Sequence, residues 1–253
     1  MRLSFGRRAV LGVVVATAAV CAVAFASATP AATRVHHGLR IASARDHRLT
    51  NSTSTNWAGY AVTGGRYTSV SASWVQPAVN CSMTPTGWSS FWVGLDGDTT
   101  NTVEQTGSEA DCSSGKAVYS AWYEMYPKFP TNYSNTVKAG DQFSASVTTD
   151  GRGRFALTLT DSTQGWTHTA NARLKSAKLG SAEVIAEAPS SSGGVLPLAD
   201  FGTAAFTAAK ANGTSFASLS GRDAITMASG TTTKATTGSI SSSGGFSVTW
   251  KHS

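Results

Sequence analysis

From residue 51 onward the sequence consists of short runs rich in Val, Thr, Phe, Tyr and Trp, separated by clusters of Gly, Ser, Asn and Asp. Helical periodicity is nearly absent. In several runs apolar residues alternate with polar ones, as at Phe143, Ala145 and Val147. Because side chains alternate faces along a strand, this pattern indicates strands with one buried and one solvated face. Many such strands without helices predict an antiparallel two-sheet β-sandwich of the jelly-roll, lectin- or glucanase-like kind.

The expected strands are spread over the whole region 51–253, which is of a size that fits one domain. They are Trp57–Val62, Tyr67–Val75, Ser89–Leu95, Thr102–Thr106, Ala117–Tyr126, Gln142–Thr149, Arg154–Thr160, Thr167–Arg173, Ala182–Glu187, Phe201–Ala208, Ala224–Ala228 and Phe246–Trp250. The Ser-, Gly- and Thr-rich stretches Ser190–Gly194 and Gly230–Gly244 are interpreted as loops or weakly specified strands.

Residues 1–28 have the pattern of a secretory signal peptide. Arg2, Arg7 and Arg8 precede an apolar run, and Ala26-Ser27-Ala28 has the small residues of a cleavage site. A membrane anchor is the alternative, but the apolar run is short and the cleavage pattern follows it directly. We therefore expect a secreted, extracellular protein with no membrane association after the signal is removed.

Residues 29–50 form a basic leader, which carries four arginines and three histidines against the single acid Asp46. We interpret Thr29–Thr50 as a pro-segment that the mature protein lacks, with a solvated tail as the alternative. Its histidines gain charge in acid while carboxylates lose theirs, which favours release of the leader at low pH.

The net charge of +6 does not extend to the expected domain. Seven of the 20 Lys and Arg residues precede residue 51, so 13 remain there, and they face 13 of the 14 acidic residues. No basic patch with interleaved aromatic residues is evident, which argues against a nucleic-acid partner.

The cysteines fit an exported protein. Cys21 leaves with the signal, so Cys81 and Cys112 remain as a predicted single disulfide. A two-cysteine metal site is the alternative, but no histidine lies near either cysteine in the sequence. Because Cys112 follows the Gln105 segment, the bridge is expected to help hold Gln105 in place.

Several catalytic chemistries lack the residues that they need. After the leader only His168 and His252 remain, and there is neither a G-x-S-x-G elbow nor an H-E-x-x-H motif. We therefore expect no metal and no cofactor, and what remains is the chemistry of carboxylates and amides.

Five strings carry polar groups beside aromatic rings, in a fixed order. They are N-W-A-G-Y (Asn56–Tyr60), W-V-G-L-D-G-D (Trp92–Asp98), Q-T-G (Gln105–Gly107), W-Y-E-M-Y-P (Trp122–Pro127) and A-E-V-I-A-E (Ala182–Glu187). In this order and approximate spacing they resemble the glutamic peptidases, also called eqolisins. The resemblance runs from about Asn56 to Glu187. It implies a two-sheet sandwich that hydrolyses peptide bonds in proteins or peptides.

The resemblance also implies the roles of individual residues. The family's catalytic glutamine matches Gln105, as water ligand and oxyanion donor, and its catalytic glutamate matches Glu187, as general base and acid. The remaining predicted substrate-binding residues would wall the cleft or support it by hydrogen bonds; they are Trp92, Asp96, Trp122, Glu124 and Tyr126. Fungal members carry an acid at the position of Ser120. We expect a monomer.

Alternatives stay open at this stage. The tryptophans could be ordinary core residues, and Glu124, between two aromatic residues, could be the working acid. A carbohydrate-binding sandwich of lectin type, or a glycoside hydrolase that uses Glu124 and Glu187 as its carboxylate pair, is the rival function.

Overall fold

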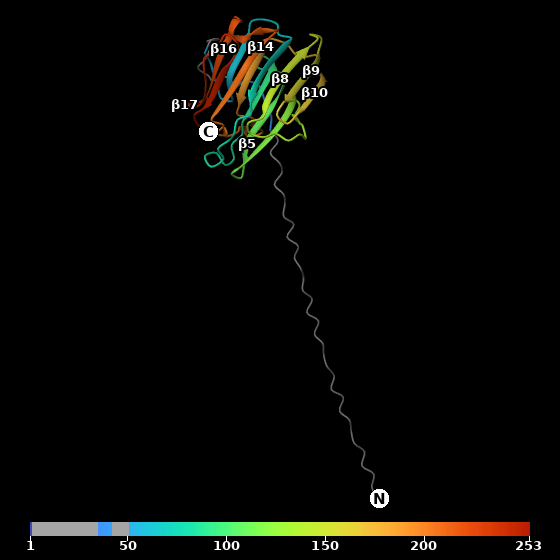
Figure 1. The fold of residues 1–253 in the computed structure, drawn as a ribbon, viewed down its shortest axis with the longest axis vertical. Coiled ribbons are helices and arrows are strands. Elements are labelled where there is room, and N and C mark those ends of the chain that lie inside the picture. Colours follow the sequence, from blue (N-terminus) through green and yellow to red (C-terminus); the bar gives the residue numbers. More distant parts are fainter. Residues whose placement is uncertain (2–34, 42–50) are drawn as a thin grey trace. The chain divides into compact units, whose positions relative to one another are not determined.

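The computed structural model describes residues 1, 35–41 and 51–253, which are built almost wholly from strands (Figure 1). The predicted signal peptide and most of the leader therefore lie outside the described residues. Among those that are described, no helix is long and apolar enough to cross a membrane.

The strands form two layers, which we call the front sheet and the back sheet. The front sheet has the order β16 (Arg222–Ser229), β2 (Trp57–Thr63), β11 (Ser181–Glu187), β4 (Ser90–Leu95), β5 (Val103–Ser113), β6 (Lys116–Tyr126) and β7 (Thr131–Asn132). The back sheet has the order β10 (Trp166–Arg173), β9 (Arg154–Asp161), β8 (Gln142–Thr149), β3 (Ser69–Val75), β14 (Thr203–Ala211), β18 (Phe246–Trp250), β17 (Thr232–Thr237) and β16.

Strand β16 belongs to both layers, because its first half pairs with β2 and its second half with β17. Figure 1 shows β16 beside β17 on one side of the molecule and β8, β9 and β10 on the other. Smaller elements complete the fold: β1 (Thr53–Ser54) parallel to β16, β15 (Thr214–Ser215) on β14, the pair β12 (Ser190–Ser191) and β13 (Gly194–Val195), and the 3-10 turn η1 (Phe216–Ser218).

The core lies between the two sheets and follows the alternation in the sequence. Phe91, Val93 and Leu95 of β4 point into it from the front sheet. Trp74 of the back sheet stacks on Phe143 and crosses the core to donate from Nε1 to Ser108 Oγ of β5, at 3.0 Å. Burial of each such large apolar side chain contributes about 1.5–3 kcal/mol. One face of the front sheet is thereby committed to the core, which leaves the other free for a site.

The structure confirms the predicted fold class and refines two strands. Strand β5 continues to Ser113, well beyond the predicted end at Thr106, because residues 107–112 are buried although several are polar. Strand β17 lies inside the stretch 230–244 that the sequence left undecided between loop and weak strand. Strand β17 is stabilised by antiparallel pairing with β16 and β18, which could not be predicted from its own threonine-rich sequence.

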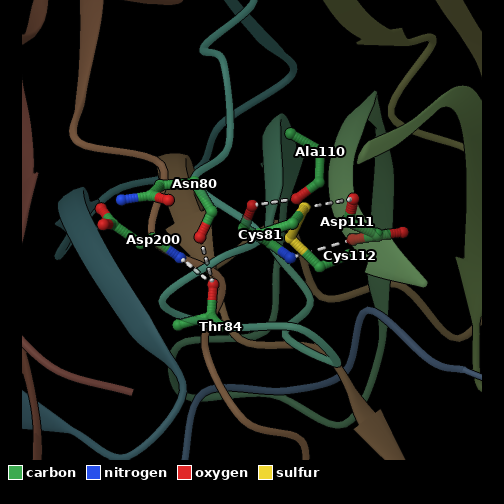
Figure 2. The surroundings of a disulfide bond; sticks show 8 residues. Asn80, Cys81, Thr84, Ala110, Asp111, Cys112 and Asp200 are labelled. Atoms are coloured by element: carbon green, nitrogen blue, oxygen red, sulfur yellow. Dashed lines mark hydrogen bonds between the residues drawn. A yellow bond between two sulfur atoms is a disulfide. The ribbon is translucent and has the colours of Figure 1, made fainter. Parts of the chain in front are cut away.

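The predicted disulfide is present and joins Cys81 to Cys112 (Figure 2). Cys112 lies near the end of β5, the strand that carries Gln105, and not in a turn after it. Around the other end of the bridge, Thr84 Oγ1 lies 3.3 Å from the carbonyl oxygen of Asn80 and accepts from the backbone nitrogen of Asp200 at 2.9 Å. The bridge thus ties the loop before β4 to β5.

Replacing both Cys81 and Cys112 with serine should lower the free energy of unfolding by roughly 3–4 kcal/mol in the chain-entropy model, because the bridge spans 31 residues. Denaturant titration of the double variant against the oxidised wild type measures the difference. An unchanged unfolding midpoint would contradict this expectation.

Candidate active site

The front sheet brings all five motifs onto adjacent strands, because β2, β11, β4, β5 and β6 follow one another in it. Gln105 on β5 lies opposite Glu124 on β6 and opposite Gly94 on β4. Glu187, the last residue of β11, lies opposite Ser90 on β4. Gly94 and Ser90 are an even number of residues apart on β4, so their partners Gln105 and Glu187 project from the same face, two strands apart.

Two motif glycines are required for this close arrangement. A Cβ at Gly107 would lie 2.2 Å from the carbonyl oxygen of Phe91, which is backbone and cannot give way. A Cβ at Gly94 would lie 2.9 Å from the ring of Trp92 and 3.2 Å from Cβ of Gln105. These glycines let the indole of Trp92 lie flat against the sheet beside Gln105.

Glu187 is fully buried, and its carboxyl group is held by two donors. Trp92 Nε1 donates to Oε2 at 2.9 Å and Asn56 Nδ2 donates to Oε1 at 3.4 Å. Burial raises the pKa of Glu187 well above its usual range, and the charge of Glu124 raises it further, while these hydrogen bonds act in the opposite direction. The group is therefore a strong proton acceptor once it is ionised.

Gln105 is also buried and directs its amide toward the same space. Its Nε2 donates to Glu124 Oε2 at 3.3 Å and to the backbone carbonyl oxygen of His37. Burial raises the pKa of Glu124 to about 9, and the charge of Glu109 adds to this, against the hydrogen bonds from the His37 backbone and Gln105. The raised pKa thus favours the protonated, uncharged form of the Glu124 carboxyl beside the Gln105 amide.

Aromatic rings line this face of the front sheet. Trp92 packs edge-on against Trp57, with ring centroids 4.9 Å apart. Trp122 stacks on the imidazole of His37, and Tyr126 meets the ring of His36 edge-on at 5.6 Å. Trp57, Trp92 and Trp122 share a small apolar cluster on this face of the sheet, separate from the main core.

Asp96 is placed differently from the sequence-based prediction. Strand β4 ends at Leu95, and Asp96 has a left-handed φ of 67°, so its side chain does not continue the alternation that places Trp92 on the free face. Its carboxylate instead accepts from the backbone nitrogens of Lys178, Leu179 and Gly180, each at 2.8 Å. The side chain fixes the loop before β11 and does not line the cleft.

Several site residues were not singled out from the sequence. Asn56 belongs to the N-W-A-G-Y string but was not assigned a role there. Glu109 follows Gln105 and Gly107 at strand spacing, a signal that could have identified it, and it accepts from Ser120 Oγ at 2.8 Å. Ser120, at the position where fungal members carry an acid, therefore donates a hydrogen bond to the carboxyl group of Glu109. Among the described residues, no group of three or more His, Cys, Asp or Glu side chains is arranged to hold a metal ion.

The buried carboxyl groups predict that the protein is most stable in acid. Burial raises the pKa of Glu104 to about 8 and that of Glu109 to about 7. The unfolded chain loses these protons near pH 4.5, before the folded protein does, so the free energy of unfolding should fall as pH rises from about 4.5 to about 8, by a few kcal/mol. Denaturant unfolding at pH 4, 6 and 8 tests this. Glu104→Gln should flatten the profile, whereas a stability maximum at pH 8 would contradict the account.

The chain was compared with known proteins once this geometry was established. A family model described as the Peptidase A4 family matches residues 55–250. Aspergillopepsin-2 of Aspergillus niger is 31% identical over 181 residues, which cover 62% of this chain and 64% of the relative. Scytalidopepsin B of Scytalidium lignicola is 34% identical over 113 residues, 44% of this chain and 42% of the relative. The alignments thus span less than two thirds of each of these curated relatives.

Among solved structures, the chain is similar to scytalido-glutamic peptidase in complex with a transition state analog inhibitor. The TM-score is 0.67 with 26% sequence identity, over 78% of this chain and 98% of that one. This likeness agrees with the two-sheet sandwich described above, and the family model covers nearly all of it. The chain belongs to the Peptidase A4 family, as the resemblance to the glutamic peptidases predicted.

Proposed function

We propose that this chain is a secreted endopeptidase that hydrolyses peptide bonds with Gln105 and Glu187. The observation that carries the proposal is a peptide group of the chain itself. The backbone carbonyl of His37, from the leader, lies in the cleft and accepts a hydrogen bond from Gln105 Nε2. A cleft that already holds an extended peptide on this amide is suited to substrates of the same kind, and membership of a peptidase family supports this reading.

In the proposed reaction the ionised Glu187 takes a proton from a water molecule. The water oxygen forms a bond to the substrate carbonyl carbon, and the negative charge passes to the carbonyl oxygen. The Gln105 amide orients the water through its oxygen and donates from Nε2 to the developing oxyanion. Glu187 then returns the proton to the amide nitrogen as the carbon–nitrogen bond breaks, which leaves a carboxylic acid and an amine.

The remaining residues bind and support the substrate. Trp92 both walls the cleft and donates to Glu187, so it orients the base. Trp122 and Tyr126 offer ring faces and edges to substrate side chains. Glu124 orients the Gln105 amide by accepting a hydrogen bond from its Nε2. It also accepts from a backbone nitrogen of the substrate, as it accepts from the backbone nitrogen of His37 at 3.0 Å in this structure.

The leader covers Glu187 in this structure, and its departure should let this carboxyl ionise more readily. His37 Nδ1 lies 3.9 Å from Glu187 Oε2, and burial is the main reason that the pKa of Glu187 is raised. When water returns to the cleft we expect that pKa to fall, because the hydrogen bonds from Trp92 and Asn56 favour the ionised form. This agrees with the interpretation of Thr29–Thr50 as a pro-segment.

The rival sugar-binding or glycosidase function is not favoured, because the family match covers the whole sandwich. Export through the signal peptide 1–28, an extracellular location and a monomeric state complete the proposal.

The test is digestion of an unstructured protein, across pH 2–7, by the chain purified from culture medium. We expect peptide products, identified by mass, and the same preparation of the Glu187→Gln variant controls for a contaminating protease. A wild-type preparation that leaves protein intact but binds or cleaves polysaccharide would overturn the proposed function.

A further inference from the structure

Residues 35–41 of the leader lie across the free face of the front sheet in a fixed register. At one end the backbone of His36 exchanges two hydrogen bonds with Ser190, of 2.7 and 2.9 Å. At the other end the backbone nitrogen of Arg40 donates to Gly97 at 3.2 Å, and Ile41 accepts from Thr55 at 2.8 Å. The segment is therefore bound through its backbone at both ends, as an extended peptide substrate would be.

The peptide group at the centre of this segment rests on the site residues. The backbone nitrogen of His37 donates to Glu124 Oε2 at 3.0 Å, and its carbonyl oxygen accepts from Gln105 Nε2. That oxygen thus occupies the position where the proposed reaction develops negative charge. The bond that follows it in the chain joins His37 to Gly38.

The imidazole of His37 fills a fitted pocket. It is 1% exposed and lies parallel to Trp122, with ring centroids 3.7 Å apart and 3° between the planes. Its Nδ1 lies 3.2 Å from Ser90 Oγ, and its Nε2 lies 3.3 Å from Glu109 Oε1. The ring therefore meets Trp122 on its face and a polar partner at each of its two nitrogen atoms.

The residues after His37 are held equally firmly. Asn56 Nδ2 donates to the carbonyl of Leu39 at 3.0 Å, and Asn56 Oδ1 accepts from the backbone nitrogen of Ile41 at 2.8 Å. The guanidinium of Arg40 pairs with Asp98 and with Asp223, the latter at 3.3 Å. Binding on both sides of Gly38 leaves the His37–Gly38 bond with little freedom to move away from Gln105 and Glu187.

We propose that the His37–Gly38 bond is cut by the chain itself, as the first step of leader removal, and that the Trp122–Ser90–Glu109 pocket selects histidine on the amino side of the cleaved bond. The step rests on the proposed function. A water molecule adds to the carbonyl carbon of His37, Glu187 passes the water's proton to the Gly38 nitrogen, and the carbon–nitrogen bond breaks. The products are a carboxyl terminus at His37 and an amino terminus at Gly38.

The self-cleavage is tested on full-length protein freed of its signal. After incubation at the pH of fastest protein digestion, intact mass and N-terminal sequencing should show a chain that begins at Gly38. The half-time should not change on tenfold dilution, because the reaction is within one molecule. The Glu187→Gln variant should stay uncut even when active wild type is added, since its own cleft covers the bond.

The specificity is tested on a synthetic peptide of residues 33–43 with the processed wild type. Cleavage should follow the second histidine and should slow by at least roughly tenfold for His37→Ala. The matched His36→Ala peptide should be affected less, because His36 is only partly buried. Wild type that digests added protein while the His37–Gly38 bond stays intact, or is cut only at other bonds, overturns this inference and leaves the proposed function standing. Wild type that digests nothing overturns both.

Discussion

Replacing Glu187 with glutamine is expected to reduce peptide hydrolysis by about 100–10,000-fold, the usual contribution of a general base. Glutamine keeps the shape of the side chain, and its amide oxygen can still accept from Trp92 Nε1 or Asn56 Nδ2. What is lost is the group that takes the proton from water. Turnover of a peptide substrate by the purified, leader-free variant measures the effect.

The fold should survive this substitution. Glu187 is fully buried and burial raises its pKa, which favours the protonated carboxyl, and a neutral amide resembles that form in shape and charge. We expect circular dichroism and thermal unfolding at pH 7 to match or exceed those of the wild type. Near-normal turnover in a folded Glu187→Gln protein would contradict the assigned role.

Replacing Gln105 with alanine is expected to reduce turnover by about 100–1,000-fold, the cost of one oxyanion donor. Loss of the water ligand would add to this deficit. The substitution also removes a partner of Glu124, so folding is checked as before. A matched control is Gln76→Ala, which removes another buried amide, one that donates to the Glu109 backbone at 3.1 Å. The Gln76→Ala variant should be less stable than the wild type, but its folded fraction should keep near-normal turnover. Equal losses of turnover in the two variants would argue against a specific role for Gln105.

Much of the fold could be predicted because burial and alternation coincide in most strands. Strands β8 and β18 have the predicted bounds, since apolar and polar residues alternate along nearly the whole of both. Strand β5 was predicted too short for the opposite reason. Glu109 and Asp111 are polar, yet both are buried: Glu109 lies against His37 of the leader, and Asp111 accepts from the backbone nitrogen of Ser89 at 3.0 Å.

The site was partly accessible to the same reasoning. Period-two alternation groups Trp122 with Glu124 and Tyr126 on one face of their strand, and extending the predicted strand beyond Thr106 would have added Glu109 to the face of Gln105. It fails where a strand ends, as at Asp96. It also cannot show which distant segment lies over a face, so the docking of His36 and His37 depends on tertiary contacts that no local pattern encodes.

The most direct test of the central claim compares kcat/KM for Glu187→Gln with that for Glu124→Gln, as leader-free proteins in one assay. Both carboxyls are buried and both have raised pKa values, so the two substitutions are chemically matched. They differ in their partners. Trp92 and Asn56 still donate to Glu187 when the leader is gone, whereas Glu124 loses its contact with the His36 ring and its donor in the His37 backbone. We predict that Glu187→Gln falls at least about 100-fold below Glu124→Gln. An inactive Glu124→Gln beside a nearly normal Glu187→Gln would show that Glu124 is the working acid and would contradict the account.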